Sequence, residues 1–79
     1  GPIPCVLGRK DTDIMVPDPM VSKTHAAIQV VNGKLLVIDL NSTNGTTVNG
    51  EQIRQREITA GDIIGMGGVH LKVLRINQP

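Results

Sequence analysis

Residues 25–40 read HAAIQVVNGKLLVIDL, and this stretch decides the fold class of the chain. Residues 25–31 alternate between two faces, a period of two that predicts a β-strand. One face carries Ala26, Ile28 and Val30, and the other carries His25, Ala27 and Gln29. Asn32-Gly33 follows as the strongest short hairpin signal, because both central positions of a type I′ turn need a positive φ. Residues 34–40 predict the returning strand, largely buried, so the stretch as a whole predicts a β-hairpin.

Short β-rich runs separated by turn residues continue on both sides of this hairpin. Strands are predicted at residues 3–7, 13–16, 46–48, 51–53, 63–64 and 69–76. The turn signals between them are Pro17-Asp18-Pro19, Asn49-Gly50, Ala60-Gly61-Asp62 and Gly67-Gly68. No window carries apolar residues at a helical period over three turns. Seven or eight short strands without a helix predict an all-β fold, an antiparallel β-sandwich whose function resides in the loops at one end.

The length and the cysteine count bound the organisation of the chain. Its 79 residues allow one domain with a thin core, which we place at residues 3–76. Gly1-Pro2 is interpreted as the remnant of a protease-cleavage site. Cys5 is the sole cysteine, which excludes an internal disulfide, and no cluster of Cys and His has the spacing of a zinc site. The sequence therefore predicts neither a metal nor another cofactor.

Charge and aromatic content argue against several classes of partner. The net charge of +1 gives no reason to expect nucleic acid or a membrane surface as a partner. Residues 35–38 are the longest apolar stretch, which is far too short to span a bilayer. The chain has no aromatic residue, which excludes stacking platforms for single-stranded nucleic acid and aromatic cages for methyl-lysine. A lone thiol suits a reducing compartment, so we expect an intracellular location, cytoplasmic or nuclear.

Three polar loops carry the side chains with which the chain could bind a ligand. They comprise residues 8–12 (Gly-Arg-Lys-Asp-Thr), 22–25 (Ser-Lys-Thr-His) and 41–46 (Asn-Ser-Thr-Asn-Gly-Thr). Together they supply a guanidinium, an ammonium, several hydroxyls, an amide and the backbone N–H groups of tight turns. These groups suit a tetrahedral dianion. Each loop taken alone is also an ordinary turn with solvated polar side chains.

The order and spacing of these residues resemble the forkhead-associated (FHA) family. The pattern runs Gly8-Arg9, Ser22-x-x-His25, Asp39-Leu40-x-Ser42-x-Asn44-Gly45-Thr46, Val48-Asn49-Gly50 and Gly61-Asp62-x-Ile64-x-x-Gly67. The resemblance covers nearly the whole chain. It implies a β-sandwich of the FHA/SMAD type that recognises phosphothreonine in extended peptides with loops at one end. The implied partner is a phosphothreonine-containing protein or peptide in signalling.

The resemblance also implies roles for individual residues. Arg9 and Ser22 would contact the phosphate, with Lys23 assisting them. Thr43 and Asn44 would face the peptide, and Asn44 would hold the peptide backbone near the phosphothreonine. The residues implied to support the site are Gly8, His25, Asp39, Gly45, Asn49 and Gly61. Among these, His25 would tie the phosphate loop to the neighbouring turn, and the glycines suit turns that need a positive φ or a close backbone approach.

Other features of the chain bear on affinity and assembly. Family members commonly have a strand before the one that leads into Gly-Arg, and many carry an aromatic residue where Thr47 stands. A missing first strand would leave the N-terminal edge unpaired, so a dimer through that edge is a further expectation. In the family, the loop before Ser-x-x-His often reads the third residue after the phosphothreonine. Met20 and Val21 occupy this loop and predict an apolar preference at that peptide position.

Two other functions are kept as alternatives. Ser22, His25 and Asp39 could serve as nucleophile, base and orienting residue of a small hydrolase. Against this, the sequence has no G-x-S-x-G elbow, and 79 residues leave little wall for a substrate pocket. An FHA-like domain could also associate with proteins without recognising phosphate, which the presence of both Arg9 and Ser22 disfavours. We therefore expect a binding module and not an enzyme.

Overall fold

The central hairpin forms in the computed structural model, which describes residues 4–74. Strand β3 (Ala26–Val31) pairs antiparallel with β4 (Lys34–Asp39), and all six residues of each strand take part. Asn32 and Gly33 make the turn with φ of 52° and 75°, the positive range that a type I′ turn requires. The prediction of this hairpin is therefore confirmed.

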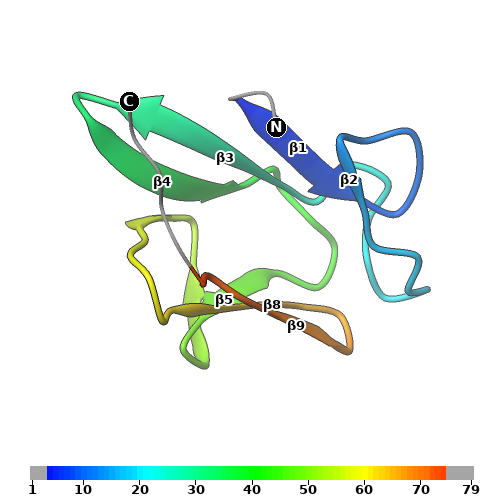
Figure 1. Cartoon of the computed structure of the whole chain (residues 1–79). Coiled ribbons are helices and arrows are strands. Elements are labelled where there is room, and N and C mark those ends of the chain that lie inside the picture. The colour runs from blue at the N-terminus through cyan, green and yellow to red at the C-terminus, as the bar shows by residue number, and fades with distance from the viewer. Residues whose placement is uncertain (1–3, 75–79) are drawn as a thin grey trace.

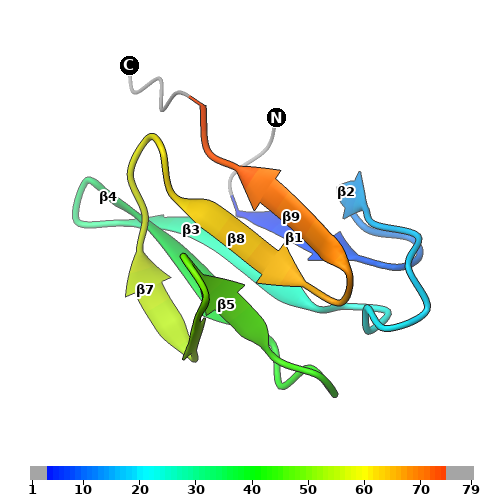
Figure 2. The ribbon, with the colours of Figure 1, turned by 90° about the horizontal axis from the view of Figure 1, so that it is seen from below.

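Within the described residues, nine strands form two sheets that pack face to face as a sandwich (Figure 1). The five-stranded sheet has the order β2-β1-β3-β4-β7, and the four-stranded sheet has the order β6-β5-β8-β9. Their further strands are β1 (Cys5–Gly8), β2 (Ile14–Met15), β5 (Thr46–Val48), β6 (Glu51–Ile53), β7 (Gln55–Glu57), β8 (Ile63–Met66) and β9 (Val69–Lys72). Figure 2 shows β9 lying over β1 and β8 over β3. The predicted all-β sandwich is confirmed, and no helix in this part of the chain is long and apolar enough to cross a membrane.

The core lies between the sheets and consists of aliphatic side chains, since the sequence offers no aromatic ones. Its buried members are Leu7, Val16, Val21, Ala26, Val37, Val48, Ile53, Ile58, Ile64 and Met66, each at most 8% exposed. Burying one of the larger side chains contributes about 1.5–3 kcal/mol to folding. His25 and Thr46 are fully buried as well, although both are polar. Their hydrogen bonds belong to the site described below.

Two strands differ from the sequence prediction. The sequence does not predict β7, because Gln55-Arg56-Glu57 contains no apolar residue. β7 nevertheless pairs with β4 as an edge strand, through backbone hydrogen bonds that do not depend on side-chain type. The returning strand is less buried than expected, because only Val37 of β4 is fully buried and four of its other residues are half-buried.

The N-terminal part of the sheet also differs from expectation. β1 pairs with β3 through residues 5–7 and with β2 only through Leu7 and Gly8, so the edge strand at this side of the described residues is β2 and not β1. The edge at this side is β2, which is two residues long and pairs in parallel with β1 through Leu7 and Ile14. The predicted domain bounds at residues 3 and 76 lie outside the described residues.

The strand register brings the polar loops to one end of the sandwich. Leu7 near the end of β1 pairs with Ala26 at the start of β3, and Ala26 pairs with Asp39 at the end of β4. In the other sheet, Thr46 at the start of β5 pairs with Met66 at the end of β8. The loops attached to these strand ends therefore lie side by side, at the right of Figure 1.

Candidate functional site

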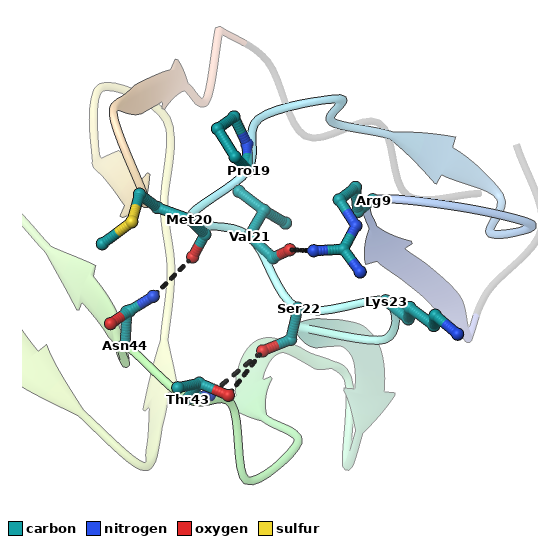
Figure 3. A pocket seen from close by; sticks show the side chains of 8 residues that line it. All are labelled: Arg9, Pro19, Met20, Val21, Ser22, Lys23, Thr43 and Asn44. Atoms are coloured by element: carbon teal, nitrogen blue, oxygen red, sulfur yellow. Dashed lines mark hydrogen bonds between the residues drawn. The ribbon is translucent and has the colours of Figure 1, made fainter.

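Three loops enclose an open hollow of about 280 Å³ at this end of the sandwich (Figure 3). Its lining residues are Arg9, Pro19, Met20, Val21, Ser22, Lys23, Thr43 and Asn44. They include all five residues assigned to ligand contacts from the sequence, namely Arg9, Ser22, Lys23, Thr43 and Asn44. The fold thus brings together, from both halves of the chain, the side chains that the motif pattern singled out.

Arg9 is held at the rim of the hollow by the loop opposite. Its backbone N–H donates to the Ser22 carbonyl at 3.0 Å, and its guanidinium Nη1 donates to the Val21 carbonyl at 3.3 Å. The preceding residue must be glycine, because a Cβ at Gly8 would overlap the Lys23 carbonyl. A guanidinium has five N–H donors, so Arg9 retains donors for an anion after making this bond. In Figure 3 its second terminal nitrogen lies on the side of Ser22 and Lys23.

Ser22 and Thr43 join two of the loops. The Thr43 N–H donates to Ser22 Oγ at 3.0 Å, and the two side-chain oxygens are 3.5 Å apart (Figure 3). The Ser22 oxygen is therefore fixed as an acceptor, while its proton is engaged only in the long contact with Thr43 Oγ1. An oxygen of a ligand in the hollow could take that proton as a shorter hydrogen bond.

Lys23 stands apart from the other lining residues. Its side chain is exposed, and in Figure 3 it extends beneath Arg9 and away from Asn44. It makes this side of the hollow positively charged together with Arg9. No carboxylate is among the lining residues, so the charged groups of the hollow are both cations.

His25 is fully buried and uses both ring nitrogens on backbone groups. The Ser22 N–H donates to Nδ1 at 3.0 Å, and Nε2 lies 2.8 Å from the Gly45 carbonyl. Because a carbonyl can only accept, Nε2 carries a proton and Nδ1 is the acceptor. The ring therefore ties the loop of Ser22 to the loop before β5, which is the supporting arrangement expected of it.

The same contacts contradict the hydrolase alternative. Neither ring nitrogen of His25 bonds to Ser22 Oγ, which accepts a backbone N–H instead. The Asp39 carboxylate does not orient His25, since it accepts its hydrogen bonds from Ser42 and Thr46. A nucleophile must lie within hydrogen-bond reach of its base. The three residues therefore do not form a catalytic triad in this structure.

Asp39 organises the loop at residues 41–45. Its Oδ1 accepts from the hydroxyls of Ser42 at 2.5 Å and of Thr46 at 2.7 Å, and its Oδ2 accepts from the Ser42 N–H at 3.1 Å. Ser42 Oγ in turn accepts from the Gly45 N–H at 3.0 Å. Burial alone would raise the pKa of the Asp39 carboxyl, but these hydrogen bonds from Ser42 and Thr46 lower it below its ordinary value of 3.8.

Asn44 lies across the hollow from Arg9 (Figure 3). Its Nδ2 donates to the Met20 carbonyl at 2.9 Å, which fixes the orientation of the amide and leaves Oδ1 and one N–H for a ligand. The Met20 side chain is 53% exposed, whereas Val21 is 1% exposed and packs in the core. Val21 is therefore the more buried of the two residues of this loop, and the apolar preference drawn from Met20 and Val21 stays a prediction.

Gly45 and Asn49, two of the residues assigned to support, do not line the hollow. Gly45 has a φ of 86°, and a Cβ there would come within 2.8 Å of Gln52 Nε2. Asn49 also has a positive φ, of 52°, in the turn between β5 and β6. Its amide donates to Asp62 Oδ1 at 3.0 Å and accepts from the Ile63 N–H at 2.9 Å. Asn49 therefore fastens its turn to the start of β8 and is remote from the lining residues.

Sequence reasoning assigned no role to Asp18, Ser42 or Thr46, although each orders a loop of the site. Asp18 Oδ1 accepts from the Met20 N–H at 2.8 Å, and the other two bond to Asp39. The spacing Asp-x-x-Ser was a signal for Ser42, because short polar side chains commonly bond to backbone groups a few residues away. Thr46 had no such local signal, since its burial follows from the packing of the two sheets.

The donor set determines what the hollow can bind. It combines a guanidinium, an ammonium, a hydroxyl and a carboxamide, which together are complementary to an anion attached to a polar backbone. The described residues contain no group of three or more His, Cys, Asp or Glu side chains placed to hold a metal ion. The chemistry offered is therefore recognition by hydrogen bonds and charge.

Comparison with known protein families identifies a match that covers most of the chain. The family model described as FHA domain matches residues 5–67. That span contains every lining residue of the hollow.

Several curated proteins and solved structures are similar to the chain. FHA domain-containing protein FhaA of Mycobacterium tuberculosis is 40% identical over 63 residues, covering 78% of this chain and 12% of FhaA. Glycogen accumulation regulator GarA of Mycolicibacterium smegmatis is 36% identical over 64 residues, covering 81% of this chain and 40% of GarA. The chain thus spans less than half the length of either relative. A structure from an analysis of phosphothreonine-dependent FHA domain interactions superposes with a TM-score of 0.85 at 36% identity, covering 95% of this chain and 78% of that one.

Proposed function

Because this chain belongs to the forkhead-associated (FHA) family, we propose that it is a phosphothreonine-dependent module for binding peptides and proteins in signalling. The observation that carries the proposal is the meeting of Arg9, Ser22 and Thr43 at one hollow. The structural neighbour named for phosphothreonine-dependent interactions supports the same ligand class. The partner is accordingly a protein or peptide that carries phosphothreonine.

In the proposed complex the phosphate lies between Arg9 and Ser22. The guanidinium donates charge-assisted hydrogen bonds to the phosphate oxygens, and the Ser22 hydroxyl donates one more. Lys23 adds positive charge from the exposed side of the hollow, where water screens it and its contribution is smaller. Thr43 contributes mainly by holding Ser22 Oγ at 3.0 Å through its N–H.

Asn44 is proposed to hold the peptide backbone next to the phosphothreonine. A carboxamide can accept from a peptide N–H and donate to a peptide carbonyl, and Asn44 keeps one group of each kind after its bond to Met20. The exposed side chain of Met20 is then placed to contact a peptide residue further along. This supports an apolar preference there, read by Met20 without help from the Val21 side chain.

We also propose that the chain binds its partner without catalysing a reaction. His25 does not serve Ser22 Oγ as a base, because both of its ring nitrogens are used on backbone groups. The proposal also includes an intracellular location, since a phosphothreonine ligand requires a kinase with access to ATP and Cys5 is a buried free thiol. With a net charge of +1, neither nucleic acid nor a membrane surface is proposed as a partner.

Calorimetric titration with a phosphothreonine peptide tests the role of Arg9. We expect Arg9→Ala to cost about 2–4 kcal/mol of binding free energy, because a charge-assisted contact to a partly desolvated phosphate is lost. Lys72→Ala is the matched control, since it also removes one positive charge but lies exposed on β9, outside the hollow. If Arg9→Ala binds the peptide with wild-type affinity, Arg9 does not contact the phosphate.

A further inference from the structure

The two side chains at opposite sides of the hollow are oriented by one loop. The Arg9 guanidinium donates to the carbonyl of Val21, and the Asn44 amide donates to the carbonyl of Met20. These two carbonyls belong to adjacent residues (Figure 3). A displacement of this loop, defined here as residues 18–21, would therefore move the partners of both Arg9 and Asn44 together.

The loop at 18–21 is a compact turn with its own hydrogen bonds. The Val21 N–H donates to the Asp18 carbonyl at 2.9 Å, and the Met20 N–H donates to Asp18 Oδ1 at 2.8 Å. The Val21 side chain anchors the turn in the core at 1% exposure. With these contacts the turn behaves as a unit, so its position depends on what it rests against.

The loop rests against the turn between β8 and β9, which belongs to the other sheet. A Cβ at Gly67 would lie 2.9 Å from Asp18 Oδ1, 3.0 Å from Val21 Cγ2 and 3.2 Å from Met20 Cβ. A Cβ at Gly67 would therefore be closer to three of the four loop residues than ordinary van der Waals contact, and these residues would have to shift to admit it. Its φ of 58° is a left-handed conformation that asparagine also tolerates, so conformation alone does not demand glycine there.

We infer that Gly67, which does not line the hollow, is a positioning residue for phosphopeptide binding, because it seats the loop whose carbonyls orient Arg9 and Asn44. This inference rests on the function proposed above. A side chain at position 67 would push the loop away from β8 and β9, and Arg9 and Asn44 would lose their alignment together. The four-stranded sheet, which contributes few groups to the hollow itself, would in this way govern its affinity.

The first test uses the wild-type chain and NMR. Titration with a phosphothreonine peptide should shift the amide signal of Gly67, since coupling between two places in a protein is reciprocal. Gly50 is the reference, because it lies in the turn between β5 and β6 with nothing within 4 Å of its would-be Cβ, and its signal should stay in place. A peptide that binds without any response at Gly67 would contradict the inference.

The second test compares Gly67→Asn with Gly50→Asn. Both variants place asparagine at a positive φ, of 58° and 83° respectively, so both carry backbone strain, but only the first has loop atoms in its way. We expect Gly67→Asn to weaken peptide binding about tenfold and Gly50→Asn to leave it unchanged. In the absence of peptide, the amide signals of Met20 and Val21 should move in Gly67→Asn alone. Gly67→Ala, with a smaller side chain, serves the same comparison if Gly67→Asn fails to fold.

A double-mutant cycle separates positioning from a general loss of stability. In an Asn44→Ala background, the Asn44 amide that Gly67 positions through the loop is already absent. Gly67→Asn should therefore weaken binding less in this background than in the wild type. Equal losses in the two backgrounds, or equal affinity of the two asparagine variants, would overturn the inference. Failure of the wild-type chain to bind any phosphothreonine peptide would instead overturn the proposed function, so the two failures are distinguishable.

Discussion

Ser22 is a donor whose position is set before any ligand arrives. Its oxygen accepts from the Thr43 N–H, its N–H donates to His25 Nδ1, and its carbonyl accepts from the Arg9 N–H. Three neighbours therefore fix one small residue. Preorganisation of this kind reduces the conformational entropy that binding would otherwise cost. It explains how a site without aromatic residues or a deep pocket could bind a phosphate specifically.

The protonation state of the phosphothreonine predicts how phosphopeptide binding depends on pH. The second pKa of a phosphothreonine is about 6, so the dianion loses one charge as the pH falls through that range. We expect binding to weaken progressively from pH 7.5 to pH 5, because Arg9 and Lys23 attract the monoanion less. Asp39 does not contribute to this change, since its pKa is held below 3.8. Calorimetry across the pH range measures the effect.

His25→Asn is the informative comparison in that titration. His25 is the titratable side chain in direct contact with Ser22, so replacing it separates protein protonation from ligand protonation. The same pH dependence in His25→Asn would assign the effect to the phosphate. Affinity that stays level in both proteins from pH 7.5 to pH 5 would contradict charge as the main determinant.

Single residues were predictable from the sequence where a motif fixed both type and spacing. Arg9, Ser22 and Asn44 were assigned in this way, and the structure brings them to one hollow. The burial of Val21 was not predicted, because a loop has no period that tells inward from outward side chains. The role of Asp18 was missed because its partners are a neighbouring backbone N–H and a turn of the other sheet. The bond from Asp18 to the Met20 N–H joins near neighbours and could have been inferred from the local sequence. The contact with the turn of the other sheet could not, because those residues are far apart in the sequence.

The loop at residues 41–45 is the element whose order depends most on one side chain. Asp39 accepts hydrogen bonds from the hydroxyls of Ser42 and Thr46, and thereby joins the end of β4 to the start of β5. Thr43 and Asn44 are carried by this loop, so its order determines their placement. Loss of the Asp39 charge should therefore affect both stability and binding.

The substitution Asp39→Asn tests how much this carboxylate contributes to stability through the loop at residues 41–45. We expect the free energy of unfolding at pH 7 to fall by about 1–3 kcal/mol, because a charged acceptor of partly buried hydrogen bonds is replaced by a neutral amide. The pKa of Asp39 is lower in the folded state than its ordinary 3.8. Its contribution is therefore complete above that pH and declines as the pH falls below it, when the unfolded chain takes up the proton first.

Urea unfolding of wild type and Asp39→Asn at several pH values measures this contribution. The difference between the two should shrink below about pH 4. Asp11→Asn is the matched control, since Asp11 is exposed and its φ of 56° suits asparagine equally well. A difference that stays constant down to pH 2, or is absent at pH 7, would contradict the role given to Asp39.

Elements were predictable where side-chain pattern and turn chemistry agreed. Asn32-Gly33 and Asn49-Gly50 each stood between extended runs, and both hairpins form. β7 could not be predicted, because its three polar residues are held by backbone pairing with β4 and carry no pattern of their own. The parallel pairing of β2 with β1 was equally hidden, since two exposed residues show no period.

Within residues 4–74 both sheets have open edge strands, and we expect any self-association to use one of them. The dimer expected at the N-terminal edge stays a prediction, but its location moves from β1 to β2, where Met15 is 59% exposed. Sedimentation velocity over a range of concentrations should detect a weak dimer that Met15→Lys reduces, because an edge lysine disfavours pairing.

Ile63→Lys is the control for that experiment, since Ile63 is also exposed, at 40%, but lies on β8 between two other strands. A dimer that resists Met15→Lys would place the contact on another edge. A chain that stays monomeric at every concentration would end the expectation of a dimer altogether.

Competition among three peptides tests the central claim most directly. The peptides are identical except for phosphothreonine, phosphoserine or threonine at one position, and the salt concentration is fixed. We expect phosphothreonine to bind best and phosphoserine more weakly, since burial of the additional methyl is worth on the order of 1 kcal/mol. Plain threonine should not bind measurably, because Arg9 and Ser22 would have no anion to hold. Equal binding of the phosphothreonine and threonine peptides would contradict phosphate recognition and leave protein association without phosphate as the function.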